Sequence, residues 1–156
     1  MTQQMSGMFV QHRQGSLAFG AATLRTGWTW RRAEIRIGER VWTVGPTDRH
    51  RIGVTAHAGD SPAVRLHPQQ SHVPGPGGPV RWHPGHRGGE LTRDGCRIRL
   101  RIPARPRGAI HVDVTGDWPD LDLVVLTAVF ALMSRRRHRT LRIVAIVGAT
   151  GHGPVG

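Results

Sequence analysis

The stretch GDWPDLDLVVLTAVFALM, residues 116–133, decides the fold of this 156-residue chain. Pro119 suits a first helical turn, acidic residues stand at the positive end of the expected helix dipole, and Arg135-Arg136-Arg137 stand at its negative end. These signals predict a helix over residues 119–134. Because apolar residues occupy all of its faces, this helix is either enclosed by protein or embedded in lipid.

The length of the apolar segment favours enclosure. Leu121–Met133 would span about 20 Å at 1.5 Å per residue, whereas the hydrocarbon layer of a membrane is about 30 Å thick, and Asp122 lies inside the segment. A second apolar run, Leu141–Val147, is rich in isoleucine and valine and predicts a last strand. Insertion of the helix into a membrane together with this run is the less favoured alternative.

The segments before the helix alternate apolar and polar residues, which is typical of β-strands. In residues 96–102 the apolar side chains, Cys96 included, share one face and three arginines share the other, and residues 110–114 can pair with this strand as a hairpin. Similar alternations, separated by turn residues, occur at 33–37, 41–44, 51–56 and 63–66. The sequence therefore predicts a mostly-β fold, an antiparallel β-barrel or strongly curled sheet with one buried hydrophobic C-terminal helix at about 119–134.

The chain divides into three expected parts. Residues 1–27 have little periodic apolar content and predict a loosely ordered N-terminal arm, residues 28–147 predict a single β-rich domain that includes the helix, and residues 148–156 predict a Gly-rich tail. Residues 72–89 are rich in proline and glycine, so we expect a long surface loop with one brief strand at 80–82. The single cysteine and the lack of an export signal predict a cytoplasmic protein.

The hairpin of residues 97–100 and 110–114, the Gly-Asp-Trp turn at 116–118 and the wholly apolar helix after it resemble the tubby C-terminal-like superfamily. That group includes tubby-like proteins, phospholipid scramblases and LURP-one-related proteins, and the resemblance covers about residues 28–139. It implies a twelve-stranded barrel threaded by such a helix, and a small lipid-facing or scaffolding module without an established catalytic centre. This chain departs from the pattern because we count only about seven to nine strands, and because an apolar run follows the helix.

Charge gives the remaining indication of function. The chain has 22 basic residues against 10 acidic ones, a net charge of +12 and a pI of about 11.9. All the basic residues are arginine, whose guanidinium group binds phosphate through paired hydrogen bonds. The candidate anion-binding residues form two dense clusters, Arg97, Arg99, Arg101, Arg105 and Arg107 on and after one strand, and Arg135, Arg136, Arg137 and Arg139 after the helix.

These clusters predict a small, basic, non-enzymatic binding or scaffolding module whose arginines bind anionic phosphates, above all lipid headgroups. A polybasic segment directly after an apolar helix suits an anionic lipid surface, so we expect a peripheral position at the inner membrane face. Sequence-nonspecific binding of nucleic acid is the runner-up. A basic domain suits a phosphate backbone, but no known recognition motif is present and aromatic residues for base stacking are few. A solvated face that only keeps the protein soluble is the plain alternative.

Other chemistry has weaker support in the sequence. No nucleophile elbow, paired carboxylates or phosphate-binding loop is present, so there are no residues from which to argue an enzyme. His83, His86 and Cys96 are too few ligands, on too flexible a segment, to predict a zinc site, and the acids before the helix lack the spacing of a calcium loop. The glycines after residue 147 are not followed by the helix and acid of a dinucleotide-binding fold. We therefore expect no cofactor and no metal.

Overall fold

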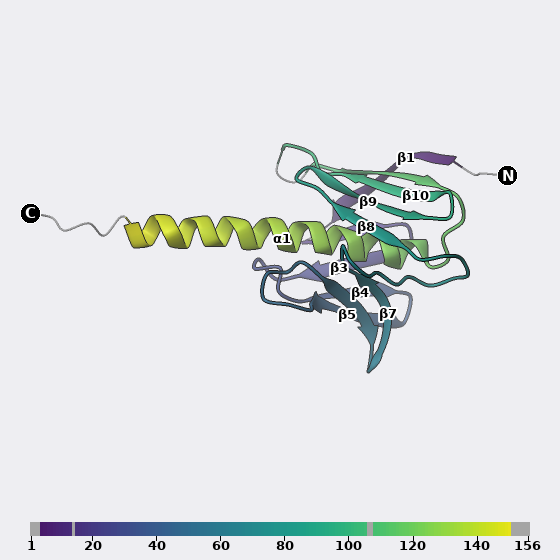
Figure 1. Cartoon of the computed structure of the whole chain (residues 1–156), viewed down its shortest axis with the longest axis horizontal. Helices are drawn as coiled ribbons and strands as arrows, with labels where there is room; N and C mark the ends of the chain where they lie inside the picture. Colours follow the sequence, from purple (N-terminus) through teal and green to yellow (C-terminus); the bar gives the residue numbers. More distant parts are fainter. Residues whose placement is uncertain (1–3, 14, 106–107, 151–156) are drawn as a thin grey trace, which may run out of the picture.

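A computed structural model of the chain describes residues 4–13, 15–105 and 108–150, with side chains described at 8–13, 15–105 and 108–140. Figure 1 shows strands on both sides of one long helix, α1. The strands are β1 (Gln4–Arg13), β2 (Ser16–Phe19), β3 (Ala22–Thr26), β4 (Ala33–Ile37), β5 (Arg40–Pro46), β6 (Val54–Ala58), β7 (Ser61–Leu66), β8 (Arg81–Pro84), β9 (Gly88–Arg93), β10 (Cys96–Arg101) and β11 (Ile110–Thr115), and α1 is Leu121–Thr150.

The eleven strands form one antiparallel sheet that curls into a nearly closed barrel. Each strand pairs with the next along the chain, except that β7 and β8 form the two edges and β1 pairs with β11. The segment after β7 bridges most of the remaining gap, because Arg65 and His72 exchange two backbone hydrogen bonds of 2.8 and 2.7 Å, and Ser71 forms a bridge with Val80. The predicted mostly-β barrel with one C-terminal helix is confirmed.

The barrel is filled by the first half of α1. Residues 123–132 are all buried, and the inward-facing residues of the strands, such as Ile98 and Leu100 of β10, pack around them. The hydroxyl of Thr127 is satisfied within the helix, because it donates to the Leu123 carbonyl at 2.7 Å. Since complete burial of one large apolar side chain stabilises a fold by roughly 1.5–3 kcal/mol, this segment is the main anchor of the barrel. The predicted enclosure of the helix is confirmed.

The helix differs from its prediction at both ends. It begins at Leu121 instead of Pro119, and the Asp120 carbonyl accepts an early helical hydrogen bond from the Val124 N–H at 3.0 Å. It continues to Thr150, so the strand predicted at 141–147 is wrong, and residues 148–150 of the predicted tail are also helical. Once nucleated, a helix gains one hydrogen bond for each added residue. A β-branched residue lowers helix stability by less than about 1 kcal/mol relative to alanine, so the isoleucines and valines of this run do not end the helix. The rest of that tail, 151–156, lies outside the described residues.

The loose arm predicted for residues 1–27 is wrong over its described part. Strands β1, β2 and β3 lie in the sheet and bury Val10, Leu17, Phe19 and Leu24. The β1 strand pairs with β11 in a register that runs from Gln4 opposite Thr115 to Val10 opposite Ile110. Local periodicity does not reveal a strand whose partner comes so much later in the chain. The single domain therefore includes residues 4–13 and 15–27.

The proline- and glycine-rich stretch at 72–89 also pairs more than predicted. It contains β8 and the start of β9, and Trp82 of β8 is buried opposite Leu91 of β9. A Cβ atom on Gly88 would overlap the Leu100 carbonyl oxygen, so glycine is what allows β9 to approach β10 there. The described chain thus has eleven strands, where about seven to nine were expected.

Candidate anion-binding end of the barrel

The antiparallel strand order sends alternate connections to opposite ends of the barrel. We call the end where α1 emerges the exit end, and the end where α1 begins the entry end. The exit end comprises Gly15 of the β1–β2 turn, the loops at 27–32, 47–53, 67–70 and 85–87, and the 102–109 loop, of which residues 102–105 and 108–109 are described. The entry end comprises the connections at 20–21, 38–39, 59–60, 94–95 and 116–120. In Figure 1 the second half of α1 runs on beyond the strands from the exit end.

Charge is divided unevenly between these two ends. The described arginines in these exit-end loops and on the emerging part of α1 are Arg31, Arg32, Arg49, Arg51, Arg87, Arg105, Arg135, Arg136, Arg137 and Arg139. The acids at the entry end and in the first turn of α1 are Glu39, Asp60, Asp94, Asp117, Asp120 and Asp122. The exit end is therefore a concentrated positive surface, and the entry end carries most of the negative charge.

Asp48 is the one acid at the exit end among the described residues, and its carboxylate is already engaged. It accepts hydrogen bonds from the backbone N–H groups of His50, Ile52 and Gly53 at 2.9, 3.1 and 2.9 Å. Burial raises the pKa of this carboxyl, but the three hydrogen bonds and the nearby His67 lower it by more, so its pKa lies below the ordinary value. Asp48 therefore shapes its own loop through these hydrogen bonds.

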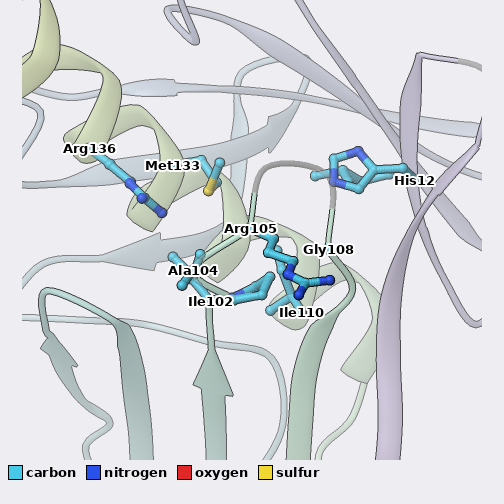
Figure 2. A pocket seen from close by; sticks show the side chains of 10 residues that line it. His12, Ile102, Ala104, Arg105, Gly108, Ile110, Met133 and Arg136 are labelled. Atoms are coloured by element: carbon cyan, nitrogen blue, oxygen red, sulfur yellow. The ribbon is translucent and has the colours of Figure 1, made fainter.

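A cavity of about 250 Å³ opens at the exit end beside α1. Figure 2 shows side chains from β1, the 102–109 loop and α1 meeting around it. Its apolar lining includes Ile102, Ile110 and Met133, and its basic lining comprises His12, Arg105 and Arg136. Among the described residues that line it, none is acidic. The cavity thus has apolar walls, with two arginines and one histidine among its polar positions.

Two further hollows continue this cavity along the base of the emerging helix. Both share Ile102 and Arg136 with the first cavity, and one adds Arg87 while the other adds Arg135 and Arg139. Burial lowers the pKa of the Arg135 guanidinium, and the nearby Arg139 lowers it further. Guanidinium groups remain protonated in proteins in spite of such shifts. The groove is therefore bordered by permanent positive charge.

Another group of side chains holds α1 where it leaves the barrel. Arg51 is only 6% exposed, and its Nη1 donates to the carbonyls of Thr29 at 2.7 Å and Ser134 at 3.1 Å. The Ser134 hydroxyl donates to the Trp30 carbonyl at 2.7 Å. Burial lowers the pKa of Arg51, and Arg31 lowers it further. These contacts tie the 27–32 and 47–53 loops to the helix.

Two exposed apolar side chains stand among these arginines. Trp28 is 69% exposed and Ile52 is 38% exposed, each in a loop of the exit end. The Arg137 guanidinium lies 4.9 Å from the centroid of the Trp28 ring, which is a cation–π contact. Tryptophan is favoured at membrane–water interfaces because one part of its ring is apolar and its N–H is polar.

The arginines predicted from the sequence do not form one site. The side chains of Arg97, Arg99 and Arg101 are exposed on the outer wall of β10, and Glu90 pairs with Arg97 at 3.1 Å and with Arg99 at 3.5 Å. The exit end instead brings together Arg105, Arg135, Arg136, Arg137 and Arg139. Arg107 lies outside the described residues.

The sequence analysis missed the residues that other loops bring to the same end. These are Trp28, Arg31, Arg32, Arg49, Arg51, Ile52 and Arg87, to which the end of β1 adds His12. The signal that could have found them is the alternation of loops between the two ends of an antiparallel sheet. With β1 to β3 unrecognised, that alternation could not be followed from the start of the barrel.

The described residues contain no group of three or more His, Cys, Asp and Glu side chains placed to hold a metal ion. In the same part of the chain, no helix is long and apolar enough to cross a membrane.

Asp122, one of the acids before the apolar run, accepts a hydrogen bond from the backbone N–H of Ala21 at 3.1 Å. This contact joins the β2–β3 turn to the first turn of α1.

Comparisons with protein-family models, with curated proteins and with solved structures found no match to this chain.

Proposed function

We propose that this protein binds the phosphates of anionic lipid headgroups at a membrane surface through the exit end of its barrel. The observation that supports the proposal is the gathering of ten arginines with one acid, Asp48, whose carboxylate is already hydrogen-bonded to its own loop. Each arginine held near an anionic membrane surface contributes about 1 kcal/mol to binding. The protein would thus sit peripherally on the membrane, with its entry end directed away from the lipid.

The exposed apolar side chains support lipid over nucleic acid as the partner. Trp28 and Ile52 lie at the same end as the arginines, and apolar groups placed between cations suit a bilayer, in which headgroups cover hydrocarbon. A phosphate backbone would use the arginines but would leave Ile52 in water. The resemblance to the tubby C-terminal-like superfamily implies a similar lipid-facing role, and membership of that superfamily remains a prediction.

Vesicle flotation tests this proposal directly. The full chain is mixed with phosphatidylcholine vesicles, or with vesicles that also contain phosphatidylglycerol, at low and at high salt. We expect flotation only with the anionic vesicles, and loss of flotation at high salt because the charges are screened. Absence of flotation with anionic vesicles at low salt would overturn the proposal.

Two triple variants test where on the molecule the lipid binds. Replacement of the exposed Arg105, Arg136 and Arg139 with glutamine removes three charges from the exit end and should abolish flotation. The control variant, with Arg36, Arg81 and Arg97 replaced by glutamine, removes the same charge from exposed positions on the barrel wall and should float as the unmodified protein does. Equal loss in both variants would contradict binding through the exit end. Circular dichroism checks that each variant is folded.

Competition with duplex DNA distinguishes lipid binding from the runner-up function, sequence-nonspecific binding of nucleic acid. If DNA displaces the vesicles, and its affinity falls steeply and linearly with the logarithm of salt concentration, nucleic acid would be the better ligand. We expect flotation to survive the addition of DNA.

A further inference from the structure

The cavity beside α1 has an apolar interior that a surface site for anions does not require. Headgroup phosphates can be bound by exposed guanidinium groups alone, whereas this hollow of about 250 Å³ presents Leu17, Ile102, Ile110 and Met133 to its interior. Sites for small organic ligands have this composition, with mostly apolar walls and a few polar groups that set the orientation. The cavity therefore calls for a ligand with an apolar part.

The ionisable groups around the cavity come from three different elements. His12 belongs to β1, Arg105 to the 102–109 loop and Arg136 to α1, and Figure 2 shows them around the same hollow. None of the described lining residues is acidic. The lining is thus best complemented by a ligand that has one negative group beside an apolar body.

We infer that this cavity binds one hydrocarbon chain of an anionic phospholipid, while Arg105 and Arg136 hold the phosphate of the same molecule. The inference rests on the proposed function, and it specifies how a single lipid is bound at the exit end. The cavity is slightly smaller than the usual range of about 300–1,000 Å³ for small-molecule sites, so we expect it to hold part of one chain and not two chains. Entry of the chain removes the apolar walls from water, which favours binding.

Alkyl phosphates of increasing chain length are the probes for this inference. Ethyl, hexyl and dodecyl phosphate are titrated by calorimetry, below the concentration at which the longest of them forms micelles. Each methylene that enters the cavity should lower the Kd by about fourfold. In a sample labelled with ¹³C at the methionine methyl groups, the Met133 signal, assigned with Met133→Leu, should shift on addition of the longer probes.

An obstructing variant places the chain in this cavity. Ala104 is exposed and lines the hollow, so Ala104→Trp should fill the space without disturbing the core. We expect this variant to lose the gain in affinity with chain length. The control is Ala58→Trp, because Ala58 is exposed at the end of β6 near the entry end, and this variant should keep the gain.

The outcomes separate the inference from the proposed function. No gain in affinity with chain length, or a gain that persists in Ala104→Trp, would overturn chain binding in this cavity, even if anionic vesicles still carry the protein upward. Loss of flotation, with the chain-length gain intact and sensitive to Ala104→Trp, would overturn the headgroup proposal and leave the cavity as a site for an alkyl phosphate.

Discussion

Asp48 and Arg51 organise the 47–53 loop of the exit end by opposite means. Asp48 accepts three backbone hydrogen bonds within the loop, and the buried Arg51 donates from the loop to Thr29 and to Ser134 of α1. Arg51 adopts a positive φ of 55°, which the loop tolerates because its side chain is held at both of these carbonyls. Single residues thus place a loop whose other members, such as Arg49, face solvent.

Replacement of Asp48 with asparagine should destabilise the protein by about 1 kcal/mol at neutral pH, because the hydrogen bonds then end on a neutral acceptor. The pKa of Asp48 is lowered in the folded state, so its contribution is complete above the unfolded-state pKa of about 3.9 and is lost as the pH falls through the lower folded-state value. Thermal unfolding at several pH values checks this. The two melting temperatures should converge in strong acid, and a difference that is independent of pH would contradict the role of the charge.

Trp28 should report contact with a membrane. Trp42, Trp82 and Trp118 are 5% exposed or less, whereas Trp28 is 69% exposed. Transfer of Trp28 into the lipid interface should therefore shift the tryptophan emission to shorter wavelength when anionic vesicles are added, and Trp28→Phe should remove most of this shift. An equal shift in Trp28→Phe would show that the exit end does not meet the lipid.

At the scale of elements, α1 has two parts with different environments. Residues 123–132 are enclosed by the barrel, while residues 135–140 are partly or fully exposed, with Arg136, Arg139 and Thr140 facing solvent. The helix contacts strands β2 to β7 and also β9, so it joins both sides of the curled sheet. One helix therefore closes the core and presents arginines outside it.

Replacement of Val125 with aspartate should unfold the domain, because an unpaired carboxylate would lie at a position that is 0% exposed. Val125→Ala is the matched control, since it removes apolar volume without adding charge; it should lower the melting temperature and leave the chain folded. Circular dichroism and urea unfolding distinguish the two variants. A folded Val125→Asp protein would contradict the enclosure of α1.

At the scale of the whole molecule, the barrel is polarised along the axis of α1. Ten arginines gather at the exit end and six acids at the entry end, so the long-range field favours one orientation at an anionic surface. The acids on the outer wall are engaged locally in part, since Glu90 pairs with Arg97 and Arg99. The net charge alone would not reveal this orientation.

Site-specific labels can measure the orientation. In a Cys96→Ala background, a polarity-sensitive fluorophore is attached at Arg87→Cys in the exit end or at Asp60→Cys in the entry end, both of which are exposed positions. Anionic vesicles should shift the emission of the label at 87 to shorter wavelength and leave the label at 60 unchanged. Similar shifts at both positions would contradict a fixed orientation.

The local parts of the fold could be predicted from the sequence. The apolar run at 123–133 indicated an enclosed helix, and the alternation around Ile98 and Val112 indicated strands. Both signals are contained in a few neighbouring residues, so they can be read without knowing the tertiary structure. The prediction for the second half of α1 was wrong, since the isoleucine- and valine-rich run at 141–147 favours a strand by propensity alone. A helix already nucleated within the barrel overrides that local preference.

The sequence by itself determined a basic, mostly-β protein built around one apolar helix, because charge and hydrophobic period are properties of neighbouring residues. Only the tertiary structure decided that β1 closes the sheet against β11, that Arg105 meets Arg136 at one cavity, and that Arg97 and Arg99 are engaged by Glu90. Each of these features depends on the register and direction of strands that pair across the barrel. Their physical origin is the packing of the sheet around α1, which brings residues together without regard to their separation along the chain.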